Sequence, residues 1–104
     1  MEKAKSFIGL AARAGRIVVG AQAVETAVRN GNARLVIIDG ESSANSQKKY
    51  TDMCRHYQVS CYSMEDPCQV AGKPGRMCIA VCDAGLAEQI EKEILREQNS
   101  GGRG

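Results

Sequence analysis

The run from Leu35 to Ile38 limits what this chain can fold into more than any other stretch. It reads Leu-Val-Ile-Ile, it shows no alternation of apolar and polar residues, and it is rich in side chains branched at Cβ. This pattern is typical of a strand that is covered on both faces. A strand of this kind needs a layer of structure above and below it, so we expect the chain to fold in three layers.

Apolar residues at helical spacing occur on both sides of this strand. Ala4, Phe7, Ile8 and Ala11 fall at i, i+3, i+4 and i+7, which predicts a helix over about 2–14 with Gly15 as its terminator. The other expected elements are a strand over about 16–19, a helix over 21–30, a polar loop over 39–46, a helix around 50–57, a strand over 59–63, a short helix over 65–71, a type II turn at Lys73–Arg76, a strand over 77–82 and a last helix around 86–94.

Strands that alternate with helices imply right-handed crossovers and helices on both faces of one sheet. The expected fold is therefore α/β, a three-layer α/β/α sandwich with a mainly parallel or mixed four-stranded sheet. We expect one domain over 1–98, because a chain of 104 residues is long enough for a single core. The Gly- and Ser-rich end, 99–104, is expected to be a disordered tail.

Several classes of protein are not expected from this sequence. No apolar run approaches the roughly 18 residues that cross a bilayer, and the N-terminus lacks a secretory pattern. We therefore expect a cytoplasmic protein with no membrane partner. Five cysteines without C-x-x-C spacing argue against a zinc site or a disulfide framework, and we interpret them as small buried residues. We expect no metal and no other cofactor.

An enzyme is the weaker interpretation of this chain. The sequence has no phosphate-binding loop, dinucleotide-binding fingerprint or nucleophile elbow. Its one histidine, His56, lies among polar residues, and a surface side chain is the better interpretation of it than a general base. We therefore expect no catalytic residues.

Charge is spread unevenly along the chain, although the net charge is only +2. Residues 1–38 hold six bases and two acids, whereas residues 65–104 hold five bases and seven acids. We therefore expect one side of the fold to be basic and the last helix to be acidic. A basic side is one mark of a nucleic-acid binder, and ordinary mixed surface charge is the alternative that stays open.

Gly20 lies between the expected strand at 16–19 and the helix at 21–30. A residue without a side chain leaves the backbone accessible beside the unpaired N–H groups of a helix start. Such an edge either binds an anionic ligand such as RNA or is an ordinary capping turn. Gly20 alone does not decide between these two interpretations.

The order of several short motifs resembles a known family. The motifs are Leu10-Ala11-x-Arg13-Ala14-Gly15-Arg16, the Gly20 turn, Gly31-x-Ala33-x-Leu35-Val36-Ile37-Ile38, Ser43-x-Asn45-Ser46-x-Lys48-Lys49 and Ala71-Gly72-Lys73. From about residue 4 to residue 97, the chain is similar to the L-seven-Ae ribosomal protein family of kink-turn RNA binders, and most to its small YlxQ-like bacterial branch. The resemblance implies the α/β/α sandwich and a non-catalytic, ribosome- or translation-associated role in binding structured RNA.

The resemblance also implies where RNA binds. In family members that bind kink-turns, the helix after the Gly20-type turn reads sheared G·A pairs through an Asn-Glu pair and a Lys one turn later. The matching residues here are Gln22, Ala23 and Thr26, so only the amide is retained. A second loop, matching 70–76, also touches the RNA in the family, with apolar residues at the positions of Val70 and Ala71.

We therefore expect RNA to contact the 19–26 turn and the 70–76 loop, with nearby cations. The candidate RNA-binding residues are Arg13, Arg16, Gly20, Ala21, Gln22, Ala23, Thr26, Lys48, Lys49, Val70, Ala71, Gly72, Lys73 and Arg76. We expect a monomer with RNA as its partner and the ribosome as one candidate. The alternative is a protein-interaction adaptor on the same scaffold that has lost specific RNA recognition, which Ala23, Thr26 and the acidic last helix favour.

Overall fold

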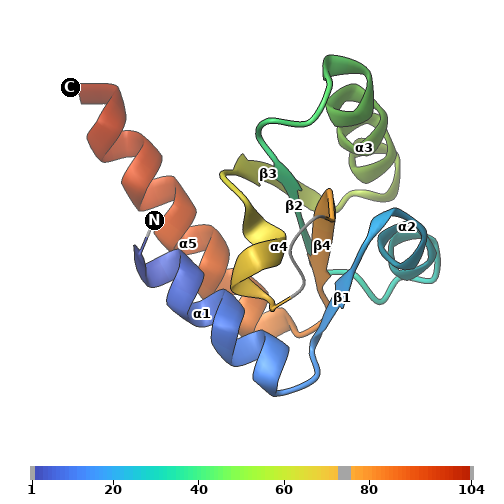
Figure 1. Cartoon of the computed structure of the whole chain (residues 1–104), viewed down its shortest axis with the longest axis horizontal. Coiled ribbons are helices and arrows are strands. Elements are labelled where there is room, and N and C mark those ends of the chain that lie inside the picture. Colours follow the sequence, from blue (N-terminus) through green and yellow to red (C-terminus); the bar gives the residue numbers. More distant parts are fainter. Residues whose placement is uncertain (1, 73–75, 104) are drawn as a thin grey trace.

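The chain folds into three layers, with a four-stranded sheet between two layers of helices (Figure 1). The computed structural model describes residues 2–72 and 76–103, and for residues 98–103 it describes the backbone alone. The elements in chain order are α1 (Glu2–Arg13), β1 (Ile17–Val19), α2 (Ala21–Arg29), β2 (Leu35–Asp39), α3 (Ala44–Tyr57), β3 (Ser60–Met64), α4 (Pro67–Val70), β4 (Cys78–Val81) and α5 (Ala84–Arg103). Among the residues described, no helix combines the length and the apolar composition that crossing a bilayer requires.

The sheet is mixed, and its strand order is β1-β4-β2-β3. β2 and β3 are parallel, while β4 pairs antiparallel with both β1 and β2. The mixed alternative of the predicted fold is therefore confirmed, since only the β2–β3 pairing is parallel. The reason lies in α4, whose four residues span about 6 Å. A helix this short does not carry the chain back along the length of the strands. β4 therefore begins at the end of the sheet where β3 finishes, and it runs in the opposite direction.

The two faces of the sheet carry separate hydrophobic cores. Leu35 and Ile37 lie in the core covered by α1, α4 and α5, while Val36 and Ile38 lie in the core covered by α2 and α3 (Figure 1). All four side chains are at most 2% exposed. The prediction of a strand covered on both faces is therefore confirmed.

Most predicted elements are found close to their expected bounds, and the loop at 39–46 is the main exception. It ends early because α3 begins at Ala44, where Ser43 Oγ accepts a hydrogen bond from Ser46 N–H (3.2 Å). The type II turn predicted at Lys73–Arg76 lies outside the described residues. The backbone of residues 99–103 continues α5, whereas the sequence predicts a disordered tail; disorder of 99–104 in solution stays a prediction.

The five cysteines are free thiols that lie in or beside the two cores. Within the described ranges, no cluster of His, Cys, Asp and Glu is arranged to hold a metal ion. Burial raises the pKa of Cys68 to about 11 and that of Cys78 also to about 11. Both thiols are therefore protonated and neutral at pH 7, as suits small side chains in a core.

The stability of the fold is expected to fall from about pH 9 to about pH 11 because of these two thiols. In the unfolded chain a thiol loses its proton near the ordinary pKa of 9.0, whereas Cys68 and Cys78 keep theirs up to about 11. The stabilisation is complete below the ordinary pKa and is lost as the pH rises through the folded pKa. The loss is at most about 1.4 kcal/mol per pH unit for each thiol, so the Tm should fall by several degrees per unit.

Thermal unfolding followed by circular dichroism across this pH window measures the effect. The double variant Cys68→Ala/Cys78→Ala is the control, and its Tm should depend less steeply on pH. An unchanged slope in the double variant would show that other groups cause the loss.

Candidate functional site

Gly20 forms a sharp turn between β1 and α2. Its φ of 101° and ψ of 156° are a combination that residues with a Cβ atom rarely adopt. Its N–H donates to the carbonyl oxygen of Cys78 (2.9 Å), and its carbonyl oxygen accepts from Val24 N–H (3.0 Å). The turn therefore ties the end of β1 to β4 and starts α2 directly afterwards.

The first turn of α2 leaves its backbone amides without acceptors. Gly20 makes no side-chain cap, and in the described part of the chain the N–H groups of Ala21, Gln22 and Ala23 donate to no acceptor. The start of α3 differs, because Ser43 caps it. Unpaired amides at a helix N-terminus carry partial positive charge and attract anions such as phosphate.

A groove of about 580 Å³ runs along α2 from this turn. Val18, Val19 and Ala27 give it an apolar lining, and the exposed residues Gln22 and Thr26 add an amide and a hydroxyl. None of the described lining residues is a carboxylate. The groove also reaches two residues at the far end of α2 that the sequence did not single out for binding, Asn30 and Asn32.

Arg76 is the predicted cation that the structure brings to the turn. A methyl group placed on Gly20 would lie 3.7 Å from Arg76 Nη1, so the guanidinium lies against the start of α2. Arg76 is exposed and forms no ion pair with any residue described.

Arg76 also borders a second hollow, which is acidic. The carboxylates that line it are those of Asp39, Glu41, Glu65 and Asp66. Since the α2 groove and the acidic hollow share only Arg76 among their lining residues, Arg76 separates them. An anionic ligand is therefore favoured on the α2 side of Arg76 and repelled on the other.

The second predicted segment also reaches α2. Ala71 and Ala23 line one hollow of about 430 Å³, together with residues of α1 and β1. Val70 and Ala71 pack against the core on the α1 side of the sheet, and Gly72 turns the chain with a φ of 84°. The predicted 19–26 and 70–76 segments are therefore neighbours in space at this hollow. Lys73 lies outside the described residues.

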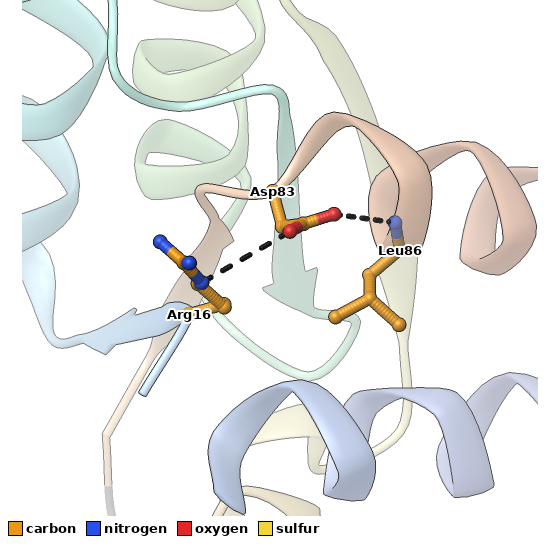
Figure 2. Close-up of polar contacts among 3 residues, drawn as sticks. All are labelled: Arg16, Asp83 and Leu86. Carbon is orange, nitrogen blue, oxygen red and sulfur yellow. Dashed lines mark hydrogen bonds and ion pairs between the residues drawn. The ribbon is translucent and has the colours of Figure 1, made fainter. Parts of the chain in front are cut away.

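Arg13 and Arg16 lie at the other end of β1. Arg16 directly precedes β1 and Gly20 directly follows it, so about 13 Å of extended chain separates the two. Arg16 Nε lies 4.0 Å from one carboxylate oxygen of Asp83, whose other oxygen accepts a hydrogen bond from Leu86 N–H (2.9 Å) at the start of α5 (Figure 2). The structure does not bring these arginines to the Gly20 turn, and their contact with RNA stays a prediction.

Lys48 and Lys49 lie in the first half of α3, and each already has a carboxylate partner. Lys48 Nζ is 3.0 Å from Asp52, and Lys49 Nζ is 3.3 Å from Glu25 on α2. The lysine side chains are 76% and 61% exposed, so the ion pairs contribute little to stability in water. Both ammonium groups are therefore able to exchange a carboxylate for a phosphate.

Comparison with known proteins decides the family. The model of the Ribosomal protein L7Ae/L30e/S12e/Gadd45 family matches residues 2–91. The chain belongs to this family. The predicted resemblance is therefore confirmed.

Relatives and solved structures extend this result. The chain is 33% identical over 97 residues to "RNA-binding protein YlxQ" of Enterococcus faecium, covering 90% of this chain and 92% of the relative. It is 36% identical over 87 residues to the protein of the same name from Bacillus subtilis (strain 168), covering 81% and 87%. A Bacillus halodurans protein of unknown function superposes with a TM-score of 0.81 at 33% identity, covering 86% of this chain and 94% of that one. The Giardia lamblia 15.5kD RNA binding protein gives a TM-score of 0.69 at 17% identity, covering 85% and 82%, and supports the fold alone.

Gly20→Ala is expected to destabilise the fold by about 1–2 kcal/mol, because an alanine is strained at this positive φ. Gly9→Ala is the matched control. Gly9 lies inside α1, and an added methyl group meets no atom within 4 Å, so this change should stabilise the helix by about 0.5–1 kcal/mol. Urea unfolding of both variants measures the difference, and equal effects would show that the Gly20 backbone is not constrained.

Proposed function

We propose that this protein is a non-catalytic, cytoplasmic RNA-binding protein of the translation apparatus that contacts kink-turn-like RNA at the start of α2 and at the 70–76 loop. The observation that supports this most is one groove without carboxylates among its described lining residues, beside the free amides of Ala21 to Ala23 and the guanidinium of Arg76. The two relatives named as RNA-binding proteins favour RNA over other polyanions.

The proposed binding depends mostly on the phosphate backbone. The free amides of Ala21 to Ala23 and the Arg76 guanidinium meet phosphate oxygens. Gly20 itself is buried beside Arg76, so its part is to shape the turn that presents these groups. Gln22 donates to and accepts from a base edge through its amide. Val70 and Ala71 supply apolar contacts from the second loop.

We expect this protein to recognise G·A pairs less specifically than kink-turn binders do. Ala23 offers no carboxylate and Thr26 offers no ammonium where kink-turn binders carry both. A hydrogen bond to a charged group contributes about 1.5–3 kcal/mol, so the loss of two weakens recognition by about two orders of magnitude or more. We therefore expect the protein to select RNA by a bent, accessible phosphate backbone and not by a particular base sequence.

Binding to a kink-turn RNA is expected to weaken steeply with salt. Three or four phosphate contacts give a slope of log K against log salt of about −2 to −4. Arg76→Gln should lower the affinity about tenfold, because one charged hydrogen bond is lost, and should reduce the slope by about 1. Fluorescence anisotropy with a labelled kink-turn RNA and a plain duplex, from about 50 to about 200 mM salt, measures both.

Lys92→Gln is the matched control for Arg76→Gln. It removes the same charge from an exposed position on α5, which covers the opposite face of the sheet from α2. Its affinity should stay within about twofold of that of the unchanged protein. No binding of either RNA at low salt would refute the proposed function.

The double variant Ala23→Glu/Thr26→Lys is expected to gain affinity for the kink-turn RNA over the duplex by about one to two orders of magnitude, because it restores two charged hydrogen bonds. Both positions are exposed, so the fold should tolerate the change. The same anisotropy assay measures it. Measurable binding before the change supports the RNA role, whereas a gain from undetectable binding favours the protein-interaction adaptor.

A further inference from the structure

A second polar hollow lies at the far end of α2. It has a volume of about 350 Å³ and is formed where α2 and α3 both end. Arg29, Arg34, Tyr57 and Gln58 are among the residues that line it, and none of the lining residues described is a carboxylate. Two guanidinium groups and an aromatic ring therefore share one site away from the Gly20 turn.

Backbone hydrogen bonds fix the segments that carry these side chains. α2 ends at Arg29, and Gly31, with a φ of 77°, turns the chain so that Asn32 N–H bonds to the carbonyl oxygen of Ala27 (2.9 Å). Arg34 N–H donates to the carbonyl oxygen of Val81 (2.8 Å), which ties Arg34 to the sheet. The hollow is therefore part of the ordered fold.

Gln58 ends α3 in a left-handed conformation, with a φ of 60° and its N–H bonded to the carbonyl oxygen of Arg55 (3.2 Å). Tyr57 is therefore the last residue of the helix, and it is 41% exposed. The centroids of the His56 and Tyr57 rings lie 4.8 Å apart, and the rings meet edge to face at 83°. An exposed aromatic ring is a stacking surface for a nucleobase.

The charge in the hollow favours a phosphate. Arg34 forms no ion pair with any residue described. Arg29 pairs with Glu25 at 3.6 Å, but Glu25 is shared with Lys49 and the Arg29 side chain is 64% exposed, so net positive charge remains. The C-terminal ends of α2 and α3 oppose an anion with about half a negative charge each. Two full guanidinium charges exceed this.

The exposed face of α2 connects the Gly20 turn, at the start of the helix, with the hollow at its end. Gln22, Thr26 and Arg29 fall at i, i+4 and i+7 and are all exposed, so they form one stripe along the helix. The nine residues of α2 span about 14 Å. An RNA strand that is held at the Gly20 turn therefore reaches the hollow by following this stripe.

We propose that the Arg29–Arg34–Tyr57 hollow binds a single-stranded RNA segment, with one base stacked on Tyr57 and a phosphate between the two guanidinium groups. The choice of RNA as ligand rests on the proposed function. The hollow extends the RNA contact from the start of α2 to its end, so that the molecule holds a structured RNA at the Gly20 turn and a single strand beyond it.

The experiment compares a kink-turn RNA with the same RNA carrying a single-stranded extension of about six uridines, within the site sizes of single-strand binders. The extension should raise the affinity of the unchanged protein at least about fivefold, the lower limit for one stacked base. Tyr57→Ala and Arg34→Gln should each remove most of this gain and leave binding of the unextended RNA within about twofold. Tyr57→Phe keeps the ring and should keep the gain.

The outcomes separate the hollow from the Gly20 site. No gain from the extension, or a full gain in both Tyr57→Ala and Arg34→Gln, overturns the hollow while binding of the unextended RNA still supports the Gly20 site. A different outcome would refute the Gly20 site and support the hollow. In it, the unchanged protein does not bind the unextended RNA but binds hexauridylate, and Tyr57→Ala does not bind hexauridylate. Competition by uridine monophosphate as strong as that by hexauridylate would make the hollow a mononucleotide site and overturn the proposal.

Discussion

The antiparallel pairing of β1 with β4 is the contact on which the candidate site depends. The register places Val19 opposite Ile79, and the bond from Gly20 N–H to the carbonyl oxygen of Cys78 (2.9 Å) continues the ladder. These strands come from the first and last thirds of the chain, and their pairing brings the Gly20 turn to Arg76, just before β4. The groove along α2 is therefore assembled by the pairing of β1 with β4, because Gly20 follows β1 and Arg76 precedes β4.

The elements of the fold were predictable from the sequence, but the order and direction of the strands were not. Leu35 to Ile38 carry a local signal, because a strand covered on both faces is apolar at every position. No local pattern says that β4 inserts between β1 and β2 and runs antiparallel to both. The charge count likewise could not say which cations lie together: Arg16 and Gly20 are close in sequence, but they lie at opposite ends of the extended strand β1.

The candidate site was predictable only where the family motifs reach it. The resemblance pointed to Gly20, Gln22, Ala71 and Arg76, which the structure places along two hollows that meet at α2. The hollow formed by Arg29, Arg34 and Tyr57 carries no local signal, because its residues come from three segments. A topological signal did exist. β2 and β3 are parallel neighbours, so both begin at the same end of the sheet. The helices that precede them, α2 and α3, must therefore finish at that end, with their last side chains close together.

Ala23 shows how this chain differs from binders that read base edges with charged side chains. Its hollow is lined by Ala71 and by residues of α1 and β1 that are all apolar. That hollow holds no cation among its described lining residues, so alanine fits there beside Ala71, and the cation nearest to a carboxylate at this position would be Arg76, across the α2 groove that Ala23 also lines. The backbone part of the surface, the free amides after Gly20, remains intact and independent of side-chain charge. On the proposed function, selectivity therefore comes from the shape of the phosphate path and from contacts farther along α2.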